Sequence, residues 1–171
     1  MDFQFDHSDR EFRSEIADFV DNELPWNWKE YDLDPDDEDT YDLVYTFRKK
    51  LSKKGWLTMA WPEEYGGQSA SHIRQLVFNE EMAYRGIPAG DPGVRMVGPI
   101  LMLYGTEEQK QEFLPKIANA EINWSQGYSE PDSGSDLASL QTKAIEDGND
   151  FVINGSKIWN SAHVSSDWMF M

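Results

Sequence analysis

The sequence has no cysteine, few basic residues and no long apolar run, and each shortage argues against a class of protein. Without cysteine there is no disulfide, thiol nucleophile or thiolate metal site. Fifteen basic residues against 32 acidic ones give a formal net charge of -17, which opposes binding to nucleic acid or an anionic membrane. No run reaches transmembrane length, and the acidic residues 1–12 do not resemble a signal peptide. We expect a soluble, cytoplasmic protein with neither nucleic acid nor membrane as a partner.

The chain nevertheless contains enough apolar material for a core. Of its 171 residues, 39% are hydrophobic and 13% aromatic, including seven tryptophans and nine phenylalanines. This length suits one ordinary domain, or one domain plus part of another. The composition therefore predicts a folded chain with a strongly charged surface. Phosphorylated small ligands remain compatible with that charge, because backbone amides bind phosphate locally.

Residues 1–121 have the apolar periodicity of helices. Apolar residues recur at helical spacing over residues 12–20, 41–51, 71–85 and 94–104. A helical run also follows Gly105. About five helices before the change of pattern at residue 121 predict an all-α unit.

Capping signals mark the ends of several of these helices. Ser8 and Glu11 have the spacing of a capping box for the first helix. Thr106 is expected as the N-cap of the helix after Gly105. Pro115 predicts a further helical start.

Two connectors between the predicted helices have unusual compositions, one aromatic and one acidic. The loop over residues 55–67, GWLTMAWPEEYGG, is broken by proline and paired glycines, and we expect its tryptophans to pack inward. The acidic connector over residues 30–42 contains alternating aspartates, but its calcium-loop positions six and twelve are Asp37 and Leu43 rather than glycine and glutamate. A solvated acidic loop is the better interpretation.

After residue 121 the pattern changes to short β-prone runs, including SKIWNS, separated by proline, glycine, aspartate and asparagine. The DGND sequence at 147–150 predicts a hairpin turn, since Asp-Gly tolerates positive φ. DWMFM at 167–171 has the composition of the start of an apolar strand. We expect an α+β chain, with an N-terminal all-α domain over 1–121 and a truncated antiparallel β-domain over 122–171.

The stretch from Gln126 to Ser161 combines a small-residue loop, rich in hydroxyls and backbone amides, with short β-runs and a tryptophan. Such an arrangement is suited to holding a planar, phosphorylated cofactor. The ordered motifs WPEEYGG, EEMAY, YGTEEQK, LPKIANAE, SEPDSGSD, TKA, DGND and NGSKIW resemble the N-terminal part of the acyl-CoA dehydrogenase family of FAD-dependent flavoproteins. The resemblance implies a helical domain, the first part of a middle β-domain whose loops hold the flavin, and a four-helix bundle beyond Met171.

The resemblance also implies which residues contact FAD. Tyr128 and Ser129 would offer amides and a hydroxyl to the pyrimidine end of the isoalloxazine. Ser161 would place a hydroxyl near N5, and Trp159 would pack against the ring system. Donors placed there would stabilise negative charge on the flavin as it accepts hydride. The implied cofactor-binding residues are Gln126, Tyr128, Ser129, Gly134, Ser135, Trp159, Asn160 and Ser161.

Two positions in the SEPDSGSD loop have further implied roles. Gly134 would allow close approach to the cofactor. Ser135 would also bind substrate, contacting the thioester side of an acyl-CoA or its pantetheine. On local grounds alone, Ser135 and Asp136 instead cap the turn that follows them, and Trp159 is a core residue of a β-run.

The implied reaction is α,β-desaturation of an acyl-CoA, in which a carboxylate removes the α-proton as the β-hydrogen leaves as hydride to N5. In the family this general base comes from the C-terminal bundle, so it is expected beyond Met171 and no catalytic residue is assigned here. The family further implies a role in fatty acid metabolism, electron-transfer flavoprotein as redox partner, and a homo-oligomer (dimer or tetramer) or a heteromer. Two alternatives stay open: a non-catalytic subunit sharing half of a flavin site, and an acidic interaction module without flavin.

Other constellations carry little chemistry. Glu80 and Glu81 are expected to be solvated or salt-bridged. Ser135, His163 and Asp167 lack the nucleophile-elbow motif of a hydrolase. The three histidines flank no metal-ligand spacing.

Overall fold

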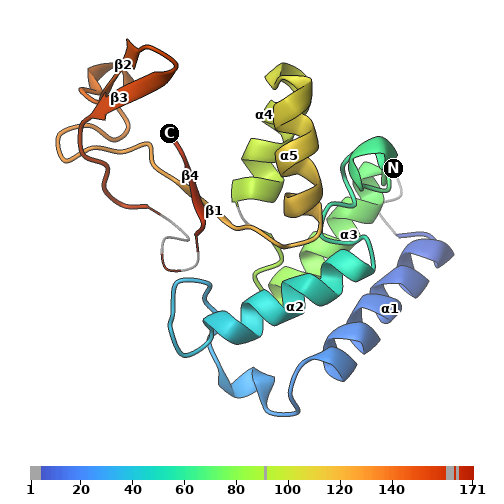
Figure 1. The fold of residues 1–171 in the computed structure, drawn as a ribbon. Helices are drawn as coiled ribbons and strands as arrows, with labels where there is room; N and C mark the ends of the chain where they lie inside the picture. Colours follow the sequence, from blue (N-terminus) through green and yellow to red (C-terminus); the bar gives the residue numbers. More distant parts are fainter. Residues whose placement is uncertain (1–4, 91, 161–163, 165) are drawn as a thin grey trace.

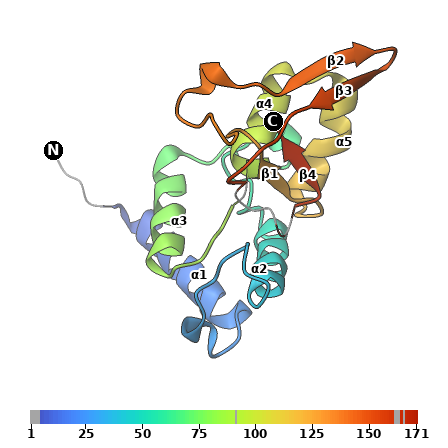
Figure 2. The ribbon, with the colours of Figure 1, turned by 90° about the vertical axis from the view of Figure 1, so that its left-hand side faces the viewer.

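The computed structural model describes residues 5–90, 92–160, 164 and 166–171. A helical unit is followed by short β elements, and the β2–β3 hairpin stands off from the helices (Figures 1 and 2). The helical elements are α1 (His7–Glu23), η1 (Trp28–Glu30), α2 (Tyr41–Lys53), η2 (Glu63–Tyr65), α3 (His72–Tyr84), the π-helix η3 (Gly93–Val97), α4 (Gly98–Tyr104), α5 (Glu107–Ala118) and η4 (Leu137–Ser139). The strands are β1 (Trp124–Gln126), β2 (Lys143–Asp147), β3 (Asp150–Asn154) and β4 (Trp168–Phe170). The predicted α+β fold is confirmed. Within the described ranges, every helix is too short or too polar to cross a membrane.

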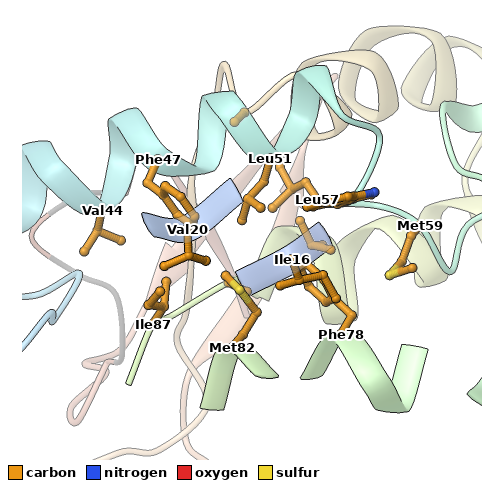
Figure 3. Packing of buried hydrophobic residues seen from close by; sticks show 14 of the residues in the cluster. Ile16, Val20, Val44, Phe47, Leu51, Leu57, Met59, Phe78, Met82 and Ile87 are labelled. Atoms are coloured by element: carbon orange, nitrogen blue, oxygen red, sulfur yellow. The ribbon is translucent and has the colours of Figure 1, made fainter. Parts of the chain in front are cut away.

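The core lies between α1, α2 and α3. Ile16 and Val20 of α1 lie one helical turn apart and are fully buried, which is the outcome that their spacing predicts. Figure 3 shows them packed with Phe47 of α2 and Met82 of α3. The amphipathic faces identified in the sequence therefore meet in one core.

The loop over residues 55–67 closes this core, and the expected inward packing of its tryptophans is confirmed. Trp56 and Trp61 are each only 4% exposed. The indole N–H of Trp61 donates to the Val94 carbonyl oxygen at 3.1 Å. The same indole lies against Gly98, where an added Cβ would come within 2.1 Å of the ring. The loop is thus fitted tightly onto η3 and α4.

Two of the predicted helix starts are wrong. The N-cap of α1 is Asp6, whose carboxylate accepts from the Asp9 backbone N–H at 2.8 Å, so Ser8 lies inside the helix and forms no capping box. Asp6, two residues earlier, accepts a hydrogen bond from a free backbone N–H of the first turn, as a serine N-cap would. Its negative charge is also stabilised by the positive end of the helix dipole. Pro115 does not start a helix but lies within α5. An interior proline loses one backbone hydrogen bond and crowds the carbonyl four residues earlier, and burial of the adjacent Leu114 and Ile117 in the core offsets this cost.

Other helix boundaries follow the sequence signals. Thr106 caps α5 by accepting from the Gln109 N–H at 3.3 Å, and the Gln109 side chain accepts from the Thr106 N–H at 3.0 Å. Ser71 caps α3 by accepting from the Arg74 N–H. Local chemistry is sufficient to set these ends.

Ion pairs connect α1 with α3 in the helical unit. Arg13 of α1 pairs with Glu80 and, at 3.5 Å, with Glu81 of α3. Arg85 also pairs with Glu81 at 2.7 Å. Of the two expectations for these glutamates, solvated or salt-bridged, the structure shows salt bridges for both.

In the acidic connector, side-chain oxygens satisfy local amides. Asp34 Oδ1 accepts from the Asp36 N–H at 2.8 Å, and Asp37 Oδ1 accepts from the Asp39 N–H at 2.9 Å. Thr40 closes the loop through hydrogen bonds to the Asp34 backbone. The carboxylates thus stabilise turns.

The β region only partly has the expected pairing. Strands β2 and β3 form the predicted antiparallel hairpin, and Gly148 at its turn has φ +67°. Strands β1 and β4 pair in parallel, with Ser125 opposite Met169, so the expectation of purely antiparallel pairing is wrong there. A long connection that includes the hairpin separates these two strands, as parallel pairing requires. The predicted β-run SKIWNS, residues 156–161, is wrong over its described part, 156–160, because Trp159 has φ +60°, which a strand does not allow.

A polar junction holds β1 and β4 on the helical unit. The buried Arg48 of α2 donates to Asn123 Oδ1. The Asn123 N–H donates to Asp167 Oδ2 at 2.9 Å, and the Asn123 carbonyl accepts from the Asp167 N–H at 3.0 Å. The ring of Trp124 packs edge-on against Phe113 of α5 at 5.5 Å. Asp167 therefore has a structural role at this junction.

Candidate functional site

The two segments predicted to contact a cofactor lie side by side. The Ile158 N–H donates to the Ser129 carbonyl at 2.9 Å. The Lys157 ammonium donates to the Tyr128 carbonyl at 3.0 Å. These bonds bring Ser129 and Trp159, which are 30 positions apart in the sequence, to neighbouring backbone positions.

Strand β4 supports the first of these segments from the other side. The Gly127 N–H donates to the Phe170 carbonyl at 2.8 Å, which extends the β1–β4 pairing by one residue. An added Cβ on Gly127 would come within 2.5 Å of Met169 Sδ, so a larger residue there would have to displace the Met169 side chain. The rings of Tyr128 and Phe170 lie 5.6 Å apart. Gln126 pairs with Phe170 in the same register.

Glu130 connects three separate segments. Its carboxylate accepts from the backbone N–H groups of Gln141 at 2.6 Å and Thr142 at 2.9 Å, and from Lys157 Nζ at 2.9 Å. Both side chains of the Glu130–Lys157 pair are nearly buried, with 6% and 11% exposed. The Thr142 side chain, the Gln141 amide and the Lys157 ammonium favour the charged form and lower the pKa of Glu130 to about 2.

The SEPDSGSD loop folds back on itself next to this pair. Glu130 and Ser133 exchange two backbone hydrogen bonds, at 2.7 and 3.0 Å. The Ser133 hydroxyl donates to the Asp136 carbonyl at 2.6 Å. Asp136 occupies the N-cap position of η4, but its side chain makes no capping hydrogen bond, so the local capping interpretation is wrong for that residue.

The remaining predicted loop residues face open space. An added Cβ on Gly134 would meet only Ser129 Oγ, at 4.0 Å, so no other described residue packs on this glycine. Ser135 is exposed beside it, while Ser129 is half-buried. The structure thus groups Ser129 with Gly134 and leaves Ser135 exposed.

Trp159 is 83% exposed, which contradicts the interpretation of this side chain as a core residue. Its backbone lies in the left-handed region, at φ +60°, a conformation that costs free energy in a residue other than glycine. Next to it, Asn160 Oδ1 is buried and, within the part of the chain that the structure describes, accepts no hydrogen bond. Ser161 and His163 lie outside the described residues.

These residues fit the chemistry of a flavin. An exposed indole is available for stacking on a planar ring, the space above Gly134 admits close approach, and the buried Asn160 oxygen would accept a ligand N–H or O–H group. Ser129 supplies a hydroxyl and a backbone amide at the same place. The described residues contain no group of three or more His, Asp or Glu side chains that would hold a metal ion.

Sequence reasoning did not assign a role to Glu130 or Lys157, although both lie in the quoted motifs. A glutamate or a lysine does not by itself indicate a site, and the hydrogen-bond donors to Glu130 lie 11 to 27 positions away from it in the sequence. A cavity of about 540 Å³ in the helical unit was also not anticipated. It lies between the loop over residues 55–67, α3 and α4, and none of the predicted cofactor-binding residues lines it.

The helical unit and the β region with its outward-facing loop define an acyl-CoA dehydrogenase-like α+β protein. Two family models match the chain: "Acyl-CoA dehydrogenase, N-terminal domain" over residues 6–121 and "Acyl-CoA dehydrogenase, middle domain" over residues 125–171. The chain therefore belongs to the acyl-CoA dehydrogenase family.

Individual relatives agree with this assignment. Acyl-CoA dehydrogenase FadE26 of Mycobacterium tuberculosis is 45% identical over 122 residues, which cover 71% of this chain and 30% of the relative. The solved ChsE4–ChsE5 complex from Mycobacterium tuberculosis is 36% identical with a TM-score of 0.88, covering all of this chain and 43% of the matched chain. The Tcur3481–Tcur3483 steroid ACAD is 38% identical with a TM-score of 0.89, again covering all of this chain and 44% of the other. The chain thus spans less than half the length of these relatives.

Proposed function

We propose that this chain supplies the flavin-facing part of an FAD-dependent oxidoreductase that dehydrogenates an acyl-CoA thioester at its α,β carbons. The observation that carries the proposal is the hydrogen bond from the Ile158 N–H to the Ser129 carbonyl, which places both predicted cofactor-binding segments together. Membership of the acyl-CoA dehydrogenase family supports it.

Each residue of the proposed site has a physical task. Tyr128 and Ser129 donate hydrogen bonds through backbone amides and a hydroxyl, and Trp159 stacks on the ring. Ser161 supplies a second hydroxyl, and the exposed Ser135 contacts the acyl-CoA. FAD, when bound, supplies the redox chemistry of the reaction. We also propose that the chain divides into a helical domain over residues 1–121 and the first part of a flavin-binding β-domain over residues 122–171.

The partners follow from the family and its relatives. We infer an acyl-CoA substrate, with acyl groups extending to steroids because a relative is described as a steroid ACAD. Electron-transfer flavoprotein is the inferred redox partner. We infer a role in lipid metabolism and a cytoplasmic location. An assembly of like or unlike subunits is inferred, and the ChsE4–ChsE5 complex favours unlike ones. In an assembly of that kind this chain would contribute half of a shared flavin site, which is the second candidate function.

The test is FAD binding to the chain and to two tryptophan variants. Trp159→Ala removes the proposed stacking surface, while Trp26→Ala removes a similarly exposed indole, 90% against 83%, far away in the sequence. FAD affinity, measured by quenching of flavin fluorescence, should fall about tenfold for Trp159→Ala and stay unchanged for Trp26→Ala. Both variants should keep their melting temperature, since neither side chain is buried.

Two outcomes would overturn the proposal. One is the absence of FAD binding to the unsubstituted chain both alone and within the assembly that completes the site. The other is an equal loss of affinity in both variants, because a general effect of removing indoles would then replace stacking at this site.

A further inference from the structure

Three stretches of the β region that are separate in sequence meet at one carboxylate. Glu130 follows directly after the predicted flavin residues Tyr128 and Ser129. Its oxygens accept from the amides of Gln141 and Thr142, just before β2, and from Lys157, just before Trp159. Neither oxygen faces bulk water, since the side chain is only 6% exposed.

The same contacts determine where the flavin-facing backbone lies. Lys157 is shared between the Glu130 carboxylate and the Tyr128 carbonyl, at 2.9 and 3.0 Å. The next residue, Ile158, then donates to the Ser129 carbonyl. One carboxylate therefore sets the spacing between the segment after β1 that carries Ser129 and the segment that carries Trp159.

The strained backbone of Trp159 needs such a constraint. A tryptophan at φ +60° remains there only when its surroundings restrict it, and its exposed side chain supplies no packing. The bonds made by Lys157 and Ile158 are the described contacts immediately before it. If these hydrogen bonds weaken, the Trp159 backbone should relax to a negative φ, and the indole would no longer point towards the proposed flavin position.

We propose that Glu130 is a positioning residue for flavin binding, acting as a three-way acceptor that holds Ser129 and Trp159 in register. The role rests on the proposed function, because it presumes that these two residues contact FAD. It assigns Glu130 no contact with the flavin itself. Its effect passes through Lys157 and the two backbone amides.

The main test compares Glu130→Gln with Glu146→Gln, a matched change of an exposed acid on β2. A glutamine has a single acceptor oxygen, so it cannot serve both amides and Lys157. We expect FAD affinity to fall about tenfold in Glu130→Gln and to stay unchanged in Glu146→Gln. Without flavin, hydrogen exchange of the Ile158 amide should quicken by about tenfold only in Glu130→Gln.

Two further variants separate positioning from general stability. Thr106→Ala lowers stability at a distant helix cap, and it should leave FAD affinity unchanged. Lys157→Met keeps both backbone amides bonded to Glu130 and removes only the hydrogen bonds made by the lysine ammonium. It should therefore weaken FAD binding by less than Glu130→Gln does. If Glu130→Gln does not fold, this milder variant provides the test, and unchanged affinity in it overturns the proposal.

The exchange of charges Glu130→Lys with Lys157→Glu examines the acceptor role directly. A lysine at position 130 cannot accept from the Gln141 and Thr142 amides, so we expect no recovery of FAD affinity. Full recovery would reduce the contact to a simple ion pair and overturn the three-way role. So would faster Ile158 exchange with unchanged FAD affinity in Glu130→Gln. Absence of FAD binding to the unsubstituted chain, both alone and within the assembly that completes the site, would instead overturn the proposed function.

Discussion

Gly98→Ala is expected to destabilise the helical unit through one contact with Trp61. An added Cβ at Gly98 would lie 2.1 Å from Trp61 Cζ2, 2.5 Å from Cη2 and 3.0 Å from Cε2. The indole has little room to retreat, since it is 4% exposed and its N–H is bonded to Val94 O. The added methyl must therefore displace either the ring or the start of α4.

Two effects of opposite sign decide the magnitude. Gly98 has helical angles, φ -55° and ψ -55°, so alanine by itself would favour the helix by about 1 kcal/mol. Overpacking a buried site costs about 1–3 kcal/mol, and so severe an overlap belongs at the upper end of that range. The net loss should be about 2 kcal/mol, which corresponds to a melting temperature lower by roughly 4–8 °C for a chain of this size.

The assay is a double-mutant cycle with Trp61→Phe, followed by thermal or denaturant unfolding. Phenylalanine lacks the distal ring atoms that the new methyl would strike, so Gly98→Ala should cost little in that background. Gly134→Ala serves as a control, because its added Cβ meets only Ser129 Oγ at 4.0 Å. Equal destabilisation by Gly98→Ala in both backgrounds would refute the reasoning, as would no loss in the unsubstituted chain.

Two further predictions concern a helix cap and an acid-dependent contact. Thr106→Ala removes the hydroxyl that accepts from the Gln109 N–H and should lower the free energy of unfolding by about 1 kcal/mol, measured by urea titration. Thr106→Ser keeps a hydroxyl and should retain most of that stability. The pKa of Glu130 is lowered from 4.5 to about 2, so its contacts stabilise the fold fully above pH 4.5 and are lost as the pH falls towards 2. The melting-temperature difference between the unsubstituted chain and Glu130→Gln should therefore shrink over that interval, and a constant difference would contradict the assignment.

Much of the fold was predictable because its signals are local. Thr106 followed by Gln109 forms the capping box that begins α5, and the glycine of DGND adopts the positive φ that its hairpin needs. The misplaced α1 start shows the limit of such signals. Both Asp6 and Ser8 are suitable N-cap residues, and sequence alone does not decide which one accepts the first free amide.

The candidate site was predictable as a list of residues but not as an arrangement. The motifs indicate Ser129 and Trp159, yet they do not predict the exposure of the indole or its left-handed backbone. The bonds that join the two segments come from Lys157 and Ile158, whose residue types are unremarkable at those positions.

The sequence by itself determined the helical periodicity, the hairpin turn and the family, because helix faces, turns and motifs depend on residues close together in the chain. Only the tertiary structure decided that β1 and β4 pair in parallel, and that one buried carboxylate serves Gln141, Thr142 and Lys157 together. The physical reason is distance along the chain. A carboxylate accepts from whichever donors the packing brings within about 3 Å, and that packing is settled by the whole core.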